Sequence, residues 1–366
     1  MSPSVERGRF FLPGPTEVHP DVLEAQVAPM IGHRGPAIEE LMSSIQSGLK
    51  SVFVTSRPVI VSTSSATGLM EAAVRNGVPM GGSVLSLVNG AFSGRFAQIA
   101  RDCGLAVDAW EIEWGDAHPV EELARRLRSK RYDAVTLSQS ETSTGALQDL
   151  ESIAEVIRGH EDTVLLVDSV TGVGGVETRT DDWGIDFVVT GSQKALALPP
   201  GLAFGVASDA VLERARTVPN RGWYFDLVRL VEKLKSNQTP ATPAISLMYA
   251  TDLQLKRIHD EGIGARWRRH LDMQARTFEW IEEMRSNGVA VGVFAKGGKR
   301  SPTVTCVTMP DELSGPEVVS EVRERGWVIG GGYGKLKQNT IRIGHMGDHT
   351  VDELDDLLDQ LRDVLA

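Results

Sequence analysis

Two charged residues stand at the ends of apolar runs, where a surface charge is uncommon. Lys194 follows the run "DFVVTGSQ", and Asp168 closes the run "TVLLVD". A buried carboxylate favours a cationic partner because an unpaired charge is costly away from water. Each residue also has an ordinary explanation, since Asp168 can cap the turn that follows it and Lys194 can extend its amine to solvent. As a pair, they indicate an amine available for covalent chemistry.

Polar side chains follow several other apolar runs. The run "PVIV" is followed by "STSSATG", which places Ser65, Ala66 and Thr67 at the start of a helical segment. Backbone N–H groups and the helix dipole at such a position favour a phosphate, although Ser and Thr are also ordinary helix caps. Phe92 follows "VLSLV" in "NGAFSGR", and Thr142 follows "AVTLS" in "QSETSTG". Ligands of open α/β sheets gather at the carboxyl ends of the strands, so we expect these side chains to share one site.

Pyridoxal phosphate is the cofactor that would use all of these groups. It requires a lysine for a Schiff base, a carboxylate at its pyridine nitrogen, an anion-binding turn and a flat side chain against its ring. Lys194, Asp168, the 65–67 turn and Phe92 match those needs in that order, and Thr142 can hydrogen-bond the ring hydroxyl or the phosphate. The sequence has no GxxxxGK[ST] motif and no GxGxxG in its first βα unit, which disfavours nucleotide binding of those kinds.

The composition is that of an ordinary globular protein and disfavours several kinds of partner. The 366 residues are enough for two domains. Thirty-eight basic against 49 acidic residues give a net charge of −11, which argues against nucleic acid or an anionic membrane as the main partner. Cys103 and Cys306 are far apart and share no metal-ligand spacing, so we expect neither a disulfide framework nor a metal site. With no signal peptide and no run of roughly 18 apolar residues, we expect a cytoplasmic protein.

Helical and strand-like patterns alternate through the first two thirds of the chain. Strand-like segments are 58–64, 82–90, 106–114, 132–140, 163–170, 186–191 and 201–208, and helical segments are 37–53, 67–78, 92–104, 119–129 and 149–160. This alternation predicts an α/β fold in which helices cover both faces of a mainly parallel sheet. We expect the strand at 201–208 to run antiparallel.

The pattern changes after residue 245. A long helical segment at 264–288 precedes short strand-like runs and two further helical segments, which suits a smaller α+β domain. No Gly/Ser-rich or Pro-rich spacer separates the two parts, so we expect a helical connection. The predicted division is an N-terminal arm of residues 1–20, a large cofactor-binding domain of 21–245 and a small C-terminal domain of 246–366.

The order of short motifs along the chain resembles the class V, fold-type I aminotransferases. The resemblance is nearest to the alanine–glyoxylate and serine–glyoxylate (serine–pyruvate) branch. The motifs run from about Leu12 to the last helix and are "PGPT", "GHR", "TSSATGLMEA", "NGAFSGR", "SETSTG", "VDSVTGVGG", "GSQKAL", "TPATPAISL" and "RIGHMG". The resemblance implies a pyridoxal-phosphate-dependent transferase with a mainly parallel seven-stranded sheet in its large domain and a small C-terminal α+β domain. It also implies a homodimer with shared active sites.

The resemblance implies a role for each matched residue near the cofactor. Lys194 would hold the cofactor as a Schiff base and then move a proton, Asp168 would keep the pyridine nitrogen protonated, and Phe92 would stack on the ring. Thr142 would lie at the ring. The phosphate would be bound by Ser65, Ala66, Thr67 and Gln193, and by the loop "SNQTPATP" of the partner chain through Thr239 or its rival Thr242.

Three further residues are implied to contact the substrate. Arg342 lies between isoleucines in "NTIRIG" and matches the family's carboxylate clamp, for which a planar guanidinium is suited. Gly14 in "PGPT" and Arg34 in "IGHRGP" are the other two. The implied reaction is transamination between alanine or serine and glyoxylate or pyruvate.

Other functions on the same fold stay open from sequence. Aminotransferases of 2-aminoethylphosphonate resemble this chain at "SETSTG", and the ureidoglycine–glyoxylate enzymes are similarly near. A cysteine desulfurase needs a nucleophilic cysteine on a mobile loop, whereas Cys103 lies in a helical segment and Cys306 in a strand-like one. A non-catalytic binding subunit would have no need of Lys194, Asp168 and Arg342.

Overall fold

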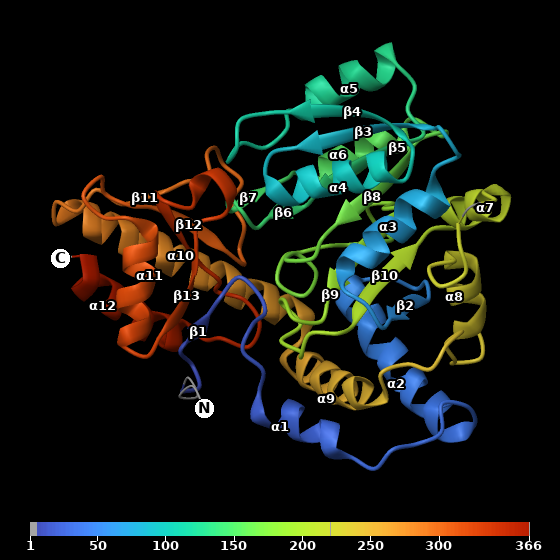
Figure 1. The fold of residues 1–366 in the computed structure, drawn as a ribbon, viewed down its shortest axis with the longest axis horizontal. Helices are drawn as coiled ribbons and strands as arrows, with labels where there is room; N and C mark the ends of the chain where they lie inside the picture. The colour runs from blue at the N-terminus through green and yellow to red at the C-terminus, as the bar shows by residue number, and fades with distance from the viewer. Residues whose placement is uncertain (1–5, 220, 366) are drawn as a thin grey trace.

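The computed structural model describes residues 6–219 and 221–365, and each of its two main sheets lies in its own lobe (Figure 1). The larger sheet has seven strands in the order β2 (Val59–Ser62), β10 (Ala203–Ala207), β9 (Phe187–Gly191), β8 (Val164–Asp168), β5 (Ala134–Ser138), β3 (Ser83–Val88) and β4 (Ala106–Glu111). β10 runs antiparallel to both of its neighbours, and the other neighbouring pairs are parallel. The predicted α/β fold, its mainly parallel sheet and its one antiparallel strand are confirmed.

Helices pack around this sheet. They are α2 (Pro36–Phe53), α3 (Ala66–Gly77), α4 (Ala91–Asp102), α5 (Val120–Ser129), α6 (Leu150–Arg158), α7 (Asp209–Thr217), α8 (Leu227–Leu234) and α9 (Ile245–Glu261). Strands β2, β5, β8, β9 and β10 are buried at every position, as expected when both faces of a sheet are covered. α2 begins at Pro36, where a missing N–H costs little, and buries an apolar face that includes Leu41, Ile45 and Leu49.

The smaller sheet lies in the orange and red lobe of Figure 1. Its strands are β1 (Phe10–Phe11), β13 (Val328–Gly331), β14 (Thr340–Ile343), β12 (Thr305–Thr308) and β11 (Gly292–Val293), in that order, and the helices of this lobe are α10 (Ile263–Ser286), α11 (Gly315–Glu324) and α12 (Val351–Leu365). β1 pairs in parallel with β13, and Phe11 is fully buried. The N-terminal segment, expected to be an arm, therefore contributes a strand to the C-terminal lobe.

Each lobe has its own hydrophobic core. The first core includes Leu255 and Ile258 of α9, and the second begins with Met273 and Trp280 of α10. The connection between the lobes is helical, as expected, because only Gly262 separates α9 from α10. By packing, the change of core falls within α10, because Ile263 at its start packs against the first core, and this point lies after the predicted boundary at residue 246.

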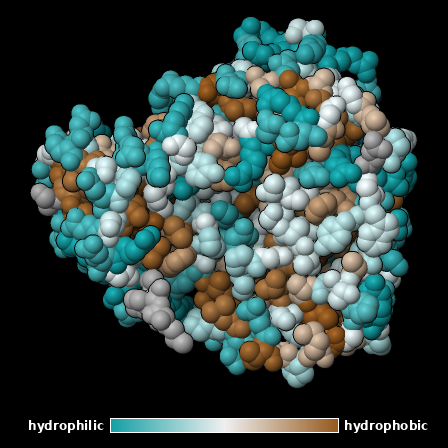
Figure 2. All heavy atoms as spheres, viewed as in Figure 1, coloured by the Kyte–Doolittle hydropathy of each residue, from teal (hydrophilic) through white to brown (hydrophobic). Residues whose placement is uncertain are grey.

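Apolar side chains gather along the lower edge of the large lobe in Figure 2, where Figure 1 places α1 (Pro20–Glu24) and α9. The exposed ones on α1, on η1 (Ala25–Val27) and just after it are Leu23, Val27 and Met30, at 47%, 72% and 68% exposure. Across the described ranges, none of the helices combines the length and apolarity needed to cross a membrane.

The sheet brings several loops to one edge. The carboxyl ends of β2, β3, β5, β8 and β9 lie at this edge because β10 alone is reversed. The register pairs Ser138 with Asp168 and Asp168 with Val189, so the ends of β5 and β8 are level. The candidate site lies here, where the N-terminal segment and β14 approach from the other lobe.

Candidate active site

Lys194 lies in the turn after β9, against the N-terminal segment. Its Nζ donates a hydrogen bond to the carbonyl of Pro13 at 2.6 Å. A Cβ built on Gly14, whose φ is +96°, would lie 2.4 Å from that Nζ, so only glycine leaves room for the lysine there. The structure thus places Gly14, predicted to contact substrate, directly beside Lys194.

The surroundings of Lys194 lower the pKa of its amine. Burial and then the nearby charge of Arg342 lower the pKa of Lys194 from 10.5 to about 8, against the opposing effect of Asp168. A pKa near 8 leaves about a tenth of the amine neutral at pH 7. The neutral amine is the form that attacks a carbonyl carbon.

Asp168 ends β8 as a buried carboxylate. Its oxygens accept hydrogen bonds from the hydroxyl of Ser138 at 2.8 Å and the backbone N–H of Val170 at 2.9 Å. Burial raises the pKa of Asp168 to about 6, although both hydrogen bonds and Lys194 act against that shift. The carboxylate is therefore mostly ionised near pH 7. It forms no ion pair with any described residue, which suits it to a cationic ring nitrogen.

Three polar side chains at the same edge make no hydrogen bond to any part of the protein that the structure describes. They are Ser65, Thr67 and Gln193, all expected to bind phosphate. Ser65 is the N-cap of α3 yet its side chain makes no capping bond, and Ala66 and Thr67 form the first turn of that helix. A helix N-terminus with free hydroxyls is an anion-binding arrangement.

Phe92 is positioned by a buried glutamate that the sequence reading did not single out. Glu141 is fully buried and accepts hydrogen bonds from the N–H groups of Phe92 (3.1 Å), Ser93 (2.9 Å) and Ser143 (3.1 Å). A Cβ on Gly90 would lie 2.3 Å from the Cγ of Glu141, so glycine is needed for this approach. The motif "SETSTG" contains Glu141, and this acid could have been recognised from the sequence as a candidate to bind the N-terminus of α4, because carboxylates stabilise helix N-termini.

Arg342 and Thr142 meet across the two lobes. Arg342 donates from Nε to the carbonyl of Gly331 at 2.8 Å and from Nη1 to the carbonyl of Thr142 at 3.3 Å. The Thr142 hydroxyl hydrogen-bonds that of Thr171 at 3.0 Å. Burial lowers the pKa of Arg342, but a guanidinium keeps its charge at any pH of interest. Arg342 also lies close enough to Lys194 to lower the pKa of its amine, and Thr142 lies beside Arg342.

Tyr333 and Arg95 complete this cluster, and neither was predicted. The rings of Tyr333 and Phe92 are 5.3 Å apart, and the guanidinium carbon of Arg342 lies 5.5 Å from the Tyr333 ring. Arg95 donates to the Tyr333 hydroxyl at 3.2 Å and lies 4.9 Å from the Phe92 ring. The glycine run before Tyr333, at the end of a strand-like segment, was the signal for a close-approach loop.

Arg34, Thr239 and Thr242 form a separate group in the single chain. Arg34 donates to the carbonyls of His33 and Pro240, at 2.6 and 3.4 Å. The hydroxyl of Thr239 is buried and donates to the carbonyl of Ala241 at 2.7 Å, whereas Thr242 is exposed. Within the described ranges, no hydrogen bond joins this group to Lys194.

Comparison with known proteins identifies the family. Residues 21–357 match the aminotransferase class-V family. This chain belongs to that family. It is 36% identical to an uncharacterized aminotransferase of Methanocaldococcus jannaschii (92% of this chain, 87% of the other) and 30% identical to the L-aspartate–glyoxylate aminotransferase of Paracoccus denitrificans (93% and 87%). The crystal structure of an alanine–glyoxylate aminotransferase from Nostoc sp. superposes with a TM-score of 0.91 at 34% identity, covering 100% of this chain and 97% of that one.

Class V aminotransferases use pyridoxal phosphate, and the residues of this aminotransferase fit that group. Ser65 and Thr67 lie at a helix N-terminus, and their hydroxyls have no hydrogen-bond partner among the described residues, which suits them to the phosphate. Buried Asp168 suits a protonated pyridine nitrogen. Lys194 supplies an amine of lowered pKa, and Phe92 a flat ring. When bound, the cofactor withdraws electrons from the substrate's Cα, so that a proton can leave it.

The cysteines of this aminotransferase do not suit a desulfurase. Cys306 is fully buried in β12, and burial raises the pKa of its thiol to about 11. Cys103 follows α4, and burial raises its pKa as well. Nucleophilic cysteines need a lowered pKa and access to substrate, so neither thiol fits that role.

Proposed function

We propose that this aminotransferase exchanges the amino group of alanine or serine with the oxo group of glyoxylate or pyruvate. The observation that carries the proposal is that one amine, one buried carboxylate and one guanidinium lie together. Lys194 and Asp168 are at one edge of the large sheet, and Arg342 approaches them from β14 of the other lobe. A non-catalytic subunit would have no reason to retain all three at this cost in desolvation.

Each of these residues has a defined task in the proposed reaction. Arg342 binds the substrate's α-carboxylate, because a planar fork of donors matches it. The Lys194 amine accepts the proton that leaves Cα and returns it to the cofactor side, which requires a pKa near the working pH. Asp168 stabilises positive charge on the ring nitrogen.

A second candidate donor carries an extra negative charge. Arg95 has no carboxylate within ion-pair distance among the described residues, and it lies beside Tyr333 at the cluster. A free guanidinium there suits the side-chain carboxylate of aspartate or the phosphonate of 2-aminoethylphosphonate. The relative from Paracoccus denitrificans bears an aspartate–glyoxylate name, which supports aspartate as the alternative.

We further propose that two copies of the chain associate and share their active sites. The exposed apolar side chains of Leu23, Val27 and Met30 would be covered in such a dimer. Thr242 is exposed and free to reach a neighbouring phosphate, whereas the Thr239 hydroxyl is engaged within its own loop. Sedimentation of Thr242→Ala and its affinity for the cofactor test this assignment: an unchanged dimer with weaker cofactor binding is expected.

The proposed reaction is tested with purified enzyme and added pyridoxal phosphate. Alanine, serine, aspartate and 2-aminoethylphosphonate are each paired with glyoxylate and pyruvate, and the amino-acid product is quantified. We expect turnover with alanine or serine that is abolished in Lys194→Ala. Turnover with aspartate alone, lost in Arg95→Ala, would replace the first candidate with the second, and no turnover with any pair would refute both.

A further inference from the structure

Three successive carbonyl groups of the lysine turn are held from outside it. The carbonyl of Gln193 accepts from the backbone N–H of Thr16 at 3.0 Å, and that of Lys194 from the Thr16 hydroxyl at 3.0 Å. The carbonyl of Ala195 accepts from Nη2 of Arg266 at 2.7 Å. The turn that carries the amine is therefore anchored by the N-terminal segment on one side and by α10 on the other.

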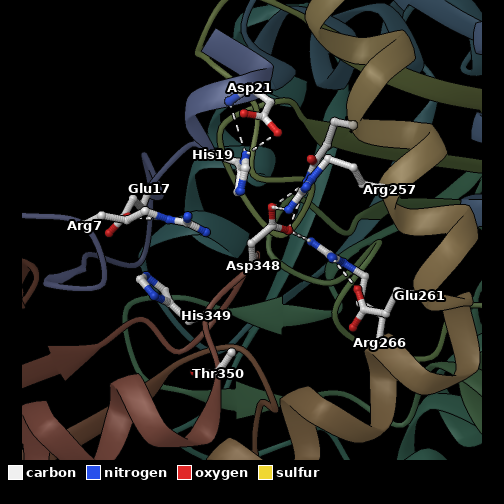
Figure 3. A network of polar contacts seen from close by, with 12 residues as sticks. Arg7, Glu17, His19, Asp21, Arg257, Glu261, Arg266, Asp348, His349 and Thr350 are labelled. Carbon is white, nitrogen blue, oxygen red and sulfur yellow. Dashed lines mark hydrogen bonds and ion pairs between the residues drawn. The ribbon is translucent and has the colours of Figure 1, made fainter. Parts of the chain in front are cut away.

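Arg266 is an unusual anchor because it is almost fully buried, at 2% exposure. Its Nη1 pairs with Glu261 at 2.7 Å, and its Nη2 pairs with Asp348 at 2.9 Å (Figure 3). Figure 3 also shows Arg257 on the other side of Asp348, at 3.6 Å. A buried ion group of this kind adds little net stability, since desolvation cancels most of the attraction. What this ion group contributes is a fixed position for the Arg266 guanidinium.

The loop that carries Asp348 is tied to both α10 and the lysine turn. The N–H of Gly347 donates to Nε2 of His270 at 3.1 Å, and its carbonyl accepts from Arg269 at 3.1 Å. Ala197 adopts a left-handed backbone with φ of +52°, and a Cβ on Gly347 would lie 3.2 Å from the Cβ of Ala197. An alanine in that conformation is strained, so its surroundings must hold it.

We propose that Arg266 and Thr16 are positioning residues for Lys194. By holding the carbonyls on either side of the lysine, they fix the direction in which its side chain leaves the turn. Nζ is thereby kept at the Pro13 carbonyl and among the groups that face it, namely Arg342, Asp168 and Arg95. The proposal rests on the proposed function only for its kinetic readout.

The variant Arg266→Lys and a matched control separate positioning from ordinary stability. Lysine keeps the positive charge and can pair with one carboxylate, but it lacks the planar fork that also reaches Ala195. Arg269 lies on the same helix, pairs with the same Glu261 at 2.8 Å and makes no hydrogen bond to the lysine turn within the described residues. Arg269→Lys therefore makes the same change from a guanidinium to an ammonium beside Glu261 without removing a hydrogen bond to the lysine turn.

The first readout is the pKa of the Lys194 amine in the cofactor-free full-length chain. It is measured by competitive acetylation across pH with mass spectrometry of the Lys194 peptide. In Arg266→Lys, an amine released from its buried place should titrate about one unit higher than in the parent, toward 10.5. In Arg269→Lys it should not move. An unmoved pKa in Arg266→Lys, or an equal shift in both variants, would overturn the proposal.

The second readout is kinetic and uses the cofactor-loaded enzyme with its best donor. Arg266→Lys should lower kcat on the order of tenfold and leave KM within twofold, because misplacing a reacting group affects the chemical step. Equal kcat in Arg266→Lys and the parent would also overturn the proposal. If the parent has no transaminase activity, the proposed function fails while the acetylation result still decides the positioning role.

A second pair of variants, which changes no charged residue, tests the proposal if Arg266→Lys does not fold. Thr16→Val removes only the hydroxyl that holds the Lys194 carbonyl, and Thr277→Val removes a similar buried hydroxyl–carbonyl bond of 2.8 Å inside α10. The amine pKa should rise in Thr16→Val and stay unchanged in Thr277→Val. The opposite pattern, or no difference between the two variants, would refute the proposed anchoring.

Discussion

Replacing Glu141 with glutamine tests how the site holds Phe92. The Oε1 atom of Glu141 accepts from Ser143 N (3.1 Å) and Oγ (2.6 Å), and Oε2 accepts from Ser93 N (2.9 Å) and Oγ (2.9 Å). Phe92 N–H is shared between both oxygens. The substitution keeps the shape of the side chain but removes its charge and turns one acceptor into a donor.

The expected destabilisation follows from these contacts. Whichever way the amide is turned, its NH2 group faces one of the backbone N–H groups of Ser93 and Ser143, and that buried donor is left without an acceptor. An unsatisfied buried donor costs about 1–3 kcal/mol, and the remaining bonds lose the assistance of a charge. Release of the desolvation cost of the carboxylate offsets part of this loss. We expect Glu141→Gln to lower the free energy of unfolding by about 2–3 kcal/mol.

Urea unfolding followed by circular dichroism measures this loss, and Glu317→Gln is the matched control. Glu317 also accepts hydrogen bonds at a helix N-terminus, from Ser314 N (3.0 Å) and Oγ (2.7 Å), but in solvent. Its substitution should have a clearly smaller effect, because water replaces the lost bonds. Glu141→Gln should also weaken cofactor binding through the displaced Phe92. Equal unfolding curves for the two variants would show that the buried carboxylate does not organise the start of α4.

Two further predictions concern the effect of His118 on the pH dependence of stability and the effect of Arg342 on substrate binding. His118 hydrogen-bonds Gln148 at 2.8 Å and the carbonyl of Trp110 at 3.0 Å, and burial lowers its pKa from 6.5 to about 4. Because the unfolded chain takes up that proton near pH 6.5 and the folded chain does not, this residue should reduce the free energy of unfolding by about 2 kcal/mol between pH 7 and pH 5. In His118→Gln, urea titrations at both pH values should show a loss of unfolding free energy that is smaller by this amount. The same loss in His118→Gln and the parent would contradict a lowered pKa for His118. Arg342→Lys should raise KM for the amino donor about tenfold with a smaller effect on kcat, since a point charge cannot bind a carboxylate with two parallel bonds; steady-state kinetics with an unaltered KM would exclude Arg342 as the clamp.

Several features of the protein follow from local sequence signals. Lys194 and Asp168 were predicted because each closes an apolar run, and the parallel sheet brings such strand ends to one edge. Reversal of β10 was predicted as well, and it leaves the remaining strands pointing the same way. The positions of these residues at strand ends could be predicted because the apolar pattern and the polar residue that ends it fall within about ten neighbouring residues.

Other features have no local signal. Phe10–Phe11 is too short for a strand pattern, and it becomes a strand only because β13 has an edge free to pair with it. Tyr333 gains its place from Phe92 and Arg95, more than 230 residues earlier in the chain.

The sequence by itself determined the family and the sheet, and it singled out Lys194, Asp168 and Arg342 as candidate residues. Only the tertiary structure decided how they are held, with Glu141 at the start of α4 and Arg266 at the carbonyl of Ala195. The physical reason is that burial of a charged side chain depends on what the two lobes pack against it. A sequence pattern records which residues avoid water, but not which distant carbonyl or carboxylate each buried charge meets.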